Sequence, residues 1–311
     1  MTSLLCIGLG YSAQVFAARV AAEGWKVAGT STSPDGAARI AALGYDGIEF
    51  DGRAPSEPLR AALASATHLL VSAPPDADGD PLLRHHASDL ANAKHLCWIG
   101  YFSTIGVYGD HGGAWIDETT PALPTSIRSR WRLDAENAWL DLGGRTRTRT
   151  EIFRLPGIYG PGRGPLEAVR RGTARAIVKP GQVFNRVHVE DIANVLAAAI
   201  ERPTEHTVYN VTDDEPAPSH EVLAYAAAQL GLPAPPIVDF DSAELTPMAR
   251  SFYSECKRTS NARIKSALGV TLLFPTYRDG MKRDAALVSR FRSSPDLDAG
   301  VPSELRNQKG H

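Results

Sequence analysis

The chain of 311 residues has an ordinary globular composition, with 43% hydrophobic and 22% charged residues and a formal net charge of −2. This near-neutral balance excludes the broad positive surface of a nucleic-acid-binding protein, and no apolar run is long enough for a transmembrane helix. The start, MTSLLCIGLG, has a strand pattern without an export signal, so we expect a cytoplasmic protein. Cys6, Cys97 and Cys256 are too few and too scattered for a disulfide framework or a metal cluster.

Short apolar runs alternate with amphipathic segments through the first half of the chain. The strand candidates, in chain order, are LLCIG (4–8), WKVAG (25–29), GIEF (47–50), HLLVSA (68–73), LCWIGYF (96–102) and EIFRL (151–155). Strands that alternate with helices predict an α/β fold, a doubly wound parallel Rossmann sheet covered by helices on both faces. After residue 160, glycines and prolines interrupt the pattern, and helical stretches near 190–201, 219–230 and 275–290 indicate a smaller, mixed α/β lobe.

This change of pattern predicts the domain organisation. We expect a dinucleotide-binding domain over residues 1–165, to which residues 185–213 return. Residues 166–184 and 214–290 would form the substrate lobe. Residues 291–311 contain few apolar residues and several helix breakers, and this predicts a loosely ordered tail.

The first strand candidate runs directly into a glycine motif. IGLGYSAQVFAARV places Gly8, Gly10 and Ala13 in the G-x-G-x-x-A spacing of dinucleotide-binding turns, with Tyr11 and Ser12 between them. The first glycine permits a tight turn, the second lets a pyrophosphate approach the backbone, and the small third residue lets helix and strand pack closely. We therefore predict that these five residues bind NAD or NADP.

The end of the second strand bears on the choice between the two cofactors, because an acidic side chain there bonds the ribose 2′-OH and repels a 2′-phosphate. The sequence GTSTSPDG offers the hydroxyls of Ser31, Thr32 and Ser33 and no carboxylate at that position, which favours NADP, although no arginine stands there to hold the phosphate. Asp51, after the third strand, is a candidate adenine contact or a turn carboxylate. Ala73, after the fourth strand, completes the predicted cofactor site.

Further motifs follow: VSAPP, STIGVYGD with DETTP after it, RLPGIYGPGR, FNRVHVEDIA, YNVTDDEP and SNARIKSALG. With IGLGYSA, they make most of residues 3–290 resemble the extended short-chain dehydrogenase/reductase superfamily, in particular its atypical, epimerase/dehydratase-like branch. The resemblance implies NAD(P) binding and places Thr104 at the position of the superfamily's catalytic Ser or Thr. Members that act on nucleotide sugars commonly have an Asn where this chain has Gly157, which argues against such substrates.

The same resemblance places the superfamily's catalytic Tyr and Lys on Arg128 and Arg132, in the stretch TSIRSRWRLDAE. In typical members the Tyr exchanges a proton with a substrate hydroxyl or carbonyl, and the Lys holds the nicotinamide ribose. A guanidinium stays protonated at any working pH, so Arg128 cannot take over the proton exchange. The predicted active site is therefore non-standard, and its predicted catalytic residues are Thr104, Arg128 and Arg132.

The helical pattern of this stretch places both arginines on or beside its apolar side. Burying a guanidinium without a partner is costly, so we expect an anion, a carboxylate or water next to each of them. Our hypothesis is that Arg128 binds an anionic group of the substrate or a protein carboxylate. Arg132 could hold the ribose hydroxyls, and Glu136, four residues later, could pair with it.

Other side chains could supply acid–base chemistry. Tyr108 and Tyr159 are candidate acids, and His188 has a suitable intrinsic pKa, but packing in a turn or in the core is the more common role for all three. Asp80, which precedes a proline, fits a helix N-cap. Arg163 could meet a substrate anion.

Two functions remain open. The first is an NAD(P)-dependent oxidoreductase or epimerase that uses Thr104 to orient a hydroxyl or carbonyl of a small molecule. The second is a cofactor-binding or sensor protein without catalysis, which the loss of Tyr and Lys favours. The Thr104 region and the second lobe favour the enzyme. We expect no metal, no nucleic-acid partner and no membrane, and the chain is a monomer or a homodimer.

Overall fold

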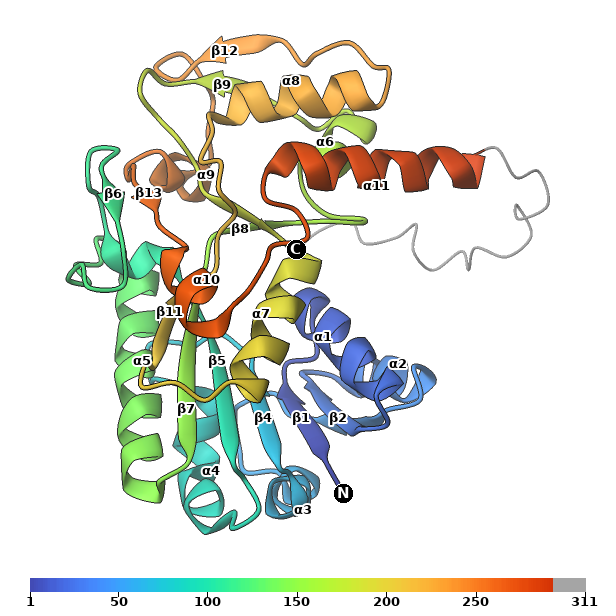
Figure 1. The fold of residues 1–311 in the computed structure, drawn as a ribbon, viewed down its shortest axis with the longest axis vertical. Helices are drawn as coiled ribbons and strands as arrows, with labels where there is room; N and C mark the ends of the chain where they lie inside the picture. The colour runs from blue at the N-terminus through green and yellow to red at the C-terminus, as the bar shows by residue number, and fades with distance from the viewer. Residues whose placement is uncertain (293–311) are drawn as a thin grey trace.

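The computed structural model describes residues 1–292, with the side chains of residues 248 and 288–292 outside this description. At its centre lies a seven-stranded sheet in which every neighbouring pair of strands is parallel (Figure 1). Its order is β11-β7-β5-β4-β1-β2-β3. The strands are β1 (Ser3–Ile7), β2 (Lys26–Ser31), β3 (Asp46–Glu49), β4 (His68–Val71), β5 (Trp98–Thr104), β7 (Arg149–Leu155) and β11 (Val208–Asn210). This sheet confirms the predicted doubly wound α/β fold.

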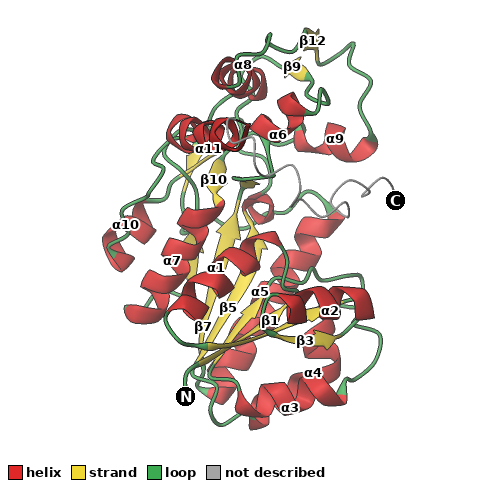
Figure 2. Cartoon of the chain, turned by 90° about the vertical axis from the view of Figure 1, so that its right-hand side faces the viewer, coloured by secondary structure: helices red, strands yellow, loops and turns green. Residues whose placement is uncertain are grey.

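Helices cover both faces of the sheet (Figures 1 and 2). One face carries α1 (Tyr11–Ala22), α2 (Pro34–Ala42), α7 (Val189–Glu201) and α10 (Ala262–Leu268). The other face carries α3 (Glu57–Ser65), α4 (Pro81–Asn92) and α5 (Ile127–Thr146). Because helices cover both faces, the central strands β1, β4 and β5 are buried along nearly their whole length, whereas β3 at the edge of the sheet is mostly exposed.

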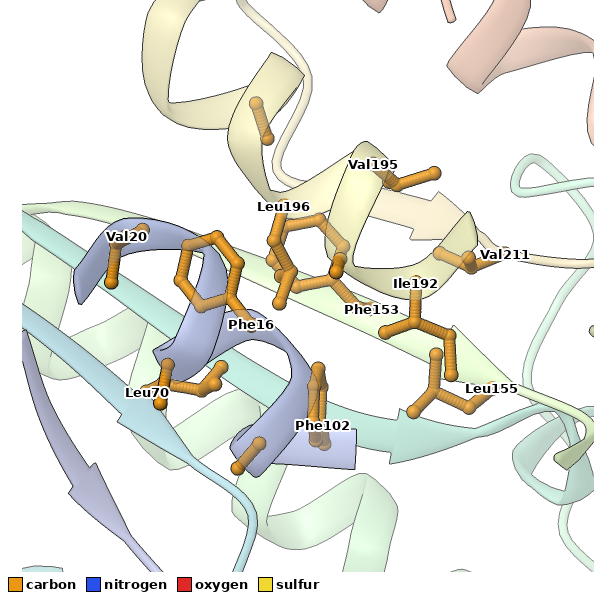
Figure 3. Close-up of a cluster of buried hydrophobic side chains, with 14 of the residues drawn as sticks. Phe16, Val20, Leu70, Phe102, Phe153, Leu155, Ile192, Val195, Leu196 and Val211 are labelled. Atoms are coloured by element: carbon orange, nitrogen blue, oxygen red, sulfur yellow. The ribbon is translucent and has the colours of Figure 1, made fainter. Parts of the chain in front are cut away.

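The larger core lies between the sheet and helices α1 and α7. Figure 3 shows Phe16 of α1 and Leu196 of α7 against Phe102 and Phe153 of the central strands, and all four side chains are buried. The chain leaves the sheet at the end of β7 and returns to it later, because α7 joins this core and β11 pairs with β7.

A smaller group of elements lies beyond the carboxyl ends of the strands (Figure 2). It comprises α6 (Pro165–Arg170), β9 (Ala176–Val178), α8 (Ser219–Gln229), β12 (Ile237–Asp239), α9 (Pro247–Phe252) and α11 (Tyr277–Arg292). Short parallel pairs join β9 to β12, β8 (Gly157–Tyr159) to β10 (Arg186–His188), and β6 (Trp115–Ile116) to β13 (Arg258–Thr259). A 3-10 turn, η1 (Ile105–Tyr108), follows β5 directly.

The end of the chain departs from the prediction at one point. Helix α11 extends to Arg292, so the first two residues of the tail predicted over 291–311 are helical. The remainder of that prediction, residues 293–311, lies outside the described residues. In the part of the chain that the structure describes, no helix is long and apolar enough to cross a membrane.

Candidate active site

The turn between β1 and α1 is tight at its first glycine and open at its second. Gly8 has φ +82°, and a Cβ there would lie 3.1 Å from the amide nitrogen of Ala73, just after β4. Gly10 is extended, with φ −87° and ψ −168°, and a Cβ there would meet no atom within 4 Å. No side chain caps α1, whereas a Ser or Asp caps each of α2, α3, α4 and α5. The first amides of α1 therefore have no side-chain acceptor, next to an unfilled space at Gly10, and this fits a pyrophosphate.

A cavity of about 540 Å³ adjoins this turn, at the carboxyl ends of β1 and β4 where the strand order reverses. Ligands of open α/β sheets bind in this crevice. Six of the predicted cofactor residues line it: Gly8, Gly10, Ser31, Thr32, Asp51 and Ala73. The other lining residues are Ile7, Leu9, Thr30, Phe50, Gly52, Ser72, Pro74, Pro75, Asp76, Pro81 and Arg84.

The remaining four predicted cofactor residues lie outside this wall. Ala13 is fully buried in the core, and Ser12 is buried beside it. The hydroxyl of Tyr11 donates to the carbonyl oxygen of Pro161 at 3.1 Å. Ser33 caps α2 by accepting a backbone N–H of its first turn. These residues build the two helix starts next to the cavity.

Two further residues shape the cavity. Thr30 of β2 is buried, and its Oγ1 accepts a hydrogen bond from the Gly8 amide at 2.8 Å, which fixes the glycine turn to β2. Arg84 of α4 is the one basic side chain among the described residues that line the cavity. Its guanidinium donates to both carboxylate oxygens of Asp76, at 2.9 and 3.2 Å, and to the carbonyl of Gly52 at 2.9 Å. The sequence around β2 gives no signal for this arginine, because helix packing brings it in from α4.

A larger cleft, of about 700 Å³, separates the end of β5 from the smaller lobe. Thr104 lines this cleft, and its Oγ1 accepts a hydrogen bond from the Gly106 amide at 3.1 Å. Arg163 lines the cleft and also lies over the ring of Tyr11, 5.3 Å from its centroid, so the cleft and the cofactor turn are neighbours. The other lining residues are Ile105, Gly106, Thr125, Ser126, Ser129, Pro156, Gly157, Ile158, Val183, Phe184, Asn185, Arg186, Ser251, Phe252, Ser254, Glu255 and Lys257.

The structure corrects the expected placement of Arg128. This side chain is exposed and is not among the residues that line the cleft, whereas its neighbour Ser129 is buried and does line it. The buried positions of α5 are Ser129, Ala135, Glu136, Trp139, Leu142 and Gly143. The hydrophobic pattern alone predicted a different buried face for α5, because the observed buried face contains the polar residues Ser129 and Glu136.

Arg132 is half-buried, but its partners differ from those expected. Its guanidinium donates to the Phe102 carbonyl at 2.6 Å and to the Tyr101 hydroxyl at 3.3 Å. The expected pairing with Glu136 is wrong, because Glu136 forms a buried salt bridge with Arg154 of β7 at 2.6 Å. Arg132 thus ties α5 to β5.

The Glu136–Arg154 pair belongs to a buried polar group behind the cleft. Ser103 donates its hydroxyl proton to Glu136 at 2.5 Å, and the Arg154 guanidinium lies 4.7 Å from the ring centroid of Tyr108. Tyr108 in turn donates to Asn210 at 2.8 Å. A buried ion pair that keeps its hydrogen bonds is tolerated, whereas removal of one partner is strongly destabilising. This group links β5, β7 and α5 at Ser103, the residue before Thr104.

The other acid–base candidates from the sequence lie outside the cleft wall. Tyr108 and Tyr159 are buried, and burial raises the pKa of both phenols. His188 is fully buried, and its Nδ1 caps α7 by accepting the Glu190 amide. Asp80 caps α4, as predicted, and also accepts the indole N–H of Trp139 at 3.0 Å.

The lobe contributes an ion pair to the cleft that the sequence did not predict. Lys257 belongs to the stretch YSECK, which is far from Thr104 in sequence, yet its Nζ is buried in the cleft wall. It donates to Glu255 at 2.7 Å and to the carbonyl of Gly109. Thr125 also donates to Glu255. The pairing of β13 with β6 brings this segment to the Rossmann domain.

Sequence comparison identifies distant relatives. No family model matches the chain. Protein YeeZ of Escherichia coli K12 is 29% identical over 230 residues, which cover 71% of this chain and 79% of YeeZ. The 3-diazoavenalumate denitrifying reductase of a Streptomyces species is 28% identical over 184 residues, which cover 55% of this chain and 56% of the reductase.

Solved structures share the fold over nearly the whole chain. A conserved protein of unknown function from Silicibacter pomeroyi is 50% identical with a TM-score of 0.84, and the match covers 93% of this chain and 99% of that one. A putative NAD-dependent epimerase/dehydratase from Methylobacillus flagellatus is 26% identical with a TM-score of 0.65, over 94% and 98% of the two chains. The human epimerase family protein SDR39U1, solved with NADPH, is 20% identical with a TM-score of 0.71, over 92% and 99%.

Proposed function

Because the chain belongs to the atypical, epimerase/dehydratase-like branch of the short-chain dehydrogenase/reductase superfamily, we propose that it is an NAD(P)-dependent oxidoreductase or epimerase. Its substrate would be an anionic small molecule bound in the cleft at Thr104. The observation that carries the proposal is the position of this cleft, which meets the Gly8–Gly10 turn through the contact between Arg163 and Tyr11.

Residues at the carboxyl ends of the strands would hold the cofactor. The open start of α1 at Gly10 accepts the pyrophosphate, and the cavity wall at Ser31, Thr32 and Asp51 surrounds the adenosine half. We favour NADP over NAD, because Ser31 and Thr32 present hydroxyls at the end of β2 where NAD-specific proteins carry an acidic side chain.

The charges of the cleft favour an anionic substrate. Arg163, Arg186 and Lys257 line the cleft, and Glu255 is the one carboxylate among the described lining residues. Because Glu255 is already paired with Lys257, and Arg186 is buried near Asp213, Arg163 supplies the exposed positive charge among the described lining residues. Arg163 is exposed in the cleft and replaces Arg128 as our candidate for the group that binds the substrate anion.

The chain's own groups would orient the substrate. When bound, the nicotinamide supplies or accepts a hydride. Thr104 keeps its hydroxyl proton available, because its Oγ1 already accepts the Gly106 amide, and it can donate to a substrate carbonyl or hydroxyl oxygen. Arg132 holds the β5 backbone at Phe102, two residues before Thr104, and so helps to fix the end of this strand.

A carbonyl panel tests this proposal. We expect the protein to oxidise NADPH with at least one of three carbonyls: benzoylformate and pyruvate, which are anionic, and 4-nitrobenzaldehyde, which is neutral. The anionic compounds should have the lower KM, and Arg163→Ala should remove that preference. Thr104→Ala should abolish turnover while NADPH still binds. Binding of NADPH without turnover of any carbonyl would contradict the enzyme and support a sensor.

A further inference from the structure

The cleft wall around Gly106 carries two hydroxyls whose protons are unused. Ser129, on the first turn of α5, is 8% exposed and lines the cleft. Its Oγ accepts a hydrogen bond from Ser126 Oγ at 2.9 Å, and Ser126 Oγ accepts the Ser129 amide at 3.1 Å. Thr104 Oγ1 accepts the Gly106 amide. Within residues 1–292, neither Ser129 nor Thr104 donates its hydroxyl proton to a protein group, so both can donate to a ligand.

The two hydroxyls flank one space, which the absence of a side chain on Gly106 keeps open. A Cβ on Gly106 would lie 2.9 Å from Ser129 Oγ and 3.3 Å from Thr104 Oγ1. The two oxygens are therefore no more than about 6.2 Å apart, so a ligand atom that lies between them in the cleft can be within hydrogen-bonding distance of both. Two donors that converge on one position are the arrangement that stabilises negative charge as it develops on a substrate oxygen.

We propose that Ser129 is a second catalytic residue of this site and acts with Thr104 on the substrate oxygen. The inference rests on the proposed function. Ser129 makes the hydrogen bond that the superfamily's Tyr makes in typical members. Arg128, the preceding residue of α5, stands at the Tyr position but is exposed and does not line the cleft. The catalytic hydroxyl has moved by one residue along the helix.

The Ser126–Ser129 pair also gives the proton a route. As the substrate oxygen gains charge, the Ser129 hydroxyl proton passes to it, the Ser126 hydroxyl proton passes to Ser129, and water restores the proton on Ser126, which is half-buried. Each serine oxygen loses one proton and gains one, the substrate oxygen gains one, and the hydroxide left by the water is neutralised by buffer. An aliphatic hydroxyl and the alcohol product have similar acidity, so the transfer to an alkoxide is nearly balanced.

The other polar groups of the cleft wall suit this task less well. The guanidinium of Arg163 stays protonated and cannot exchange a proton. Glu255 already accepts hydrogen bonds from Thr125 and Lys257. Ser254 also lines the cleft, but its hydroxyl proton is used in a hydrogen bond to the Ser251 carbonyl at 2.7 Å. Ser254 is therefore a matched control for the loss of a cleft hydroxyl.

A spectroscopic test reads the hydrogen bonds without turnover. The probe is benzoylformate labelled with ¹³C at the ketone carbon and bound to the full chain with NADP⁺, and the signal is its infrared carbonyl band. Ser129→Ala and Thr104→Ala should each move the band to higher frequency, because the carbonyl loses a donor. Ser254→Ala should leave it in place. A bound carbonyl band that Ser129→Ala does not move would overturn the role of Ser129 and leave the proposed function intact.

Kinetics provide the second arm, with NADPH and the fastest carbonyl of the panel. Ser129→Ala should lower kcat about 10²-fold, the loss typical of one donor to a developing oxyanion, with the Kd of NADPH unchanged. Gly106→Ala should cause a similar loss, because its methyl displaces Ser129 Oγ. Ser126→Ala should lower kcat less and raise the solvent deuterium isotope effect. Wild-type kcat in Ser129→Ala would overturn the inference, whereas a wild-type protein that reduces no carbonyl would fail the proposed function and the inference together.

Discussion

Glu151 of β7 makes the stability of the fold depend on pH in a predictable direction. Its side chain is 1% exposed, and its Oε2 accepts the indole N–H of Trp98 at 2.6 Å. Its other oxygen has no hydrogen-bond partner within the described residues, and the nearest cation, Arg149, is 4.0 Å away. Burial raises the pKa of this carboxyl from 4.5 to about 7. The folded state therefore holds the Glu151 proton more tightly than the unfolded state does.

The sign and the size of the effect follow from this pKa. Stability from Glu151 is fully present below pH 4.5 and is lost as the pH rises to about 7, because the folded state binds the extra proton in that interval. At ~1.4 kcal/mol per pH unit, the loss amounts to about 3 kcal/mol. Glu151→Gln still accepts the Trp98 bond and cannot ionise. The variant should match the wild type near pH 4.5 and exceed its free energy of unfolding by about 3 kcal/mol at pH 8.

Urea unfolding between pH 4.5 and 8.5, followed by circular dichroism, measures this difference. Other carboxyls also titrate, but subtraction of the wild-type curve from the Glu151→Gln curve isolates Glu151. Glu49→Gln is the control, because Glu49 is an exposed carboxyl on β3. If the free energy of unfolding of Glu151→Gln differed from that of the wild type by the same amount at every pH in this range, the reasoning would be refuted.

Two further predictions concern the frame of the site. Thr30→Val removes the buried acceptor of the Gly8 amide, so it should cost about 1–3 kcal/mol of stability and weaken NADPH binding. Thr30→Ser keeps the hydroxyl and should behave like the wild type. Thermal unfolding and a binding titration measure both effects, and a Thr30→Val variant with wild-type stability and binding would contradict the prediction. Glu136→Gln leaves the Arg154 charge buried without its counter-ion and should lower the free energy of unfolding, measured with a chemical denaturant, by about 3–5 kcal/mol. A decrease of less than 1 kcal/mol would show that the ion pair is dispensable for stability.

The cavity at the Gly8–Gly10 turn, which we propose holds the cofactor, could be predicted from the sequence because its signals are local. The Gly8–Gly10 spacing, the hydroxyls after β2 and the alternation of strands and helices depend on neighbouring residues, and the structure places Gly8, Gly10, Ser31 and Thr32 in one cavity wall. Arg84 could not be found in this way, because only the packing of α4 brings it there.

The cleft that we propose is catalytic depends on features that a hydrophobic pattern does not contain. The face of α5 that is buried includes Glu136, which pairs with Arg154. A pattern that counts only apolar residues therefore predicted that Arg128, and not Ser129, lies on the buried face. Lys257 reaches the cleft through strand pairing far along the chain. Contacts of this kind can be predicted only when the three-dimensional fold is known.

The central claim is that a nicotinamide dinucleotide lies against the Gly10 turn, and one pair of titrations tests it. Energy transfer from tryptophan to NADPH, with NADH in parallel, reports binding to the wild type and to Gly10→Val. A Cβ at Gly10 would meet no protein atom within 4 Å and the backbone there is extended, so the variant should fold with an unchanged Tm while its side chain occupies the cofactor's space. We predict binding to the wild type, tighter for NADPH than for NADH, and none to Gly10→Val. A wild type that binds neither dinucleotide, or a Gly10→Val variant that binds as well as the wild type, would contradict the account.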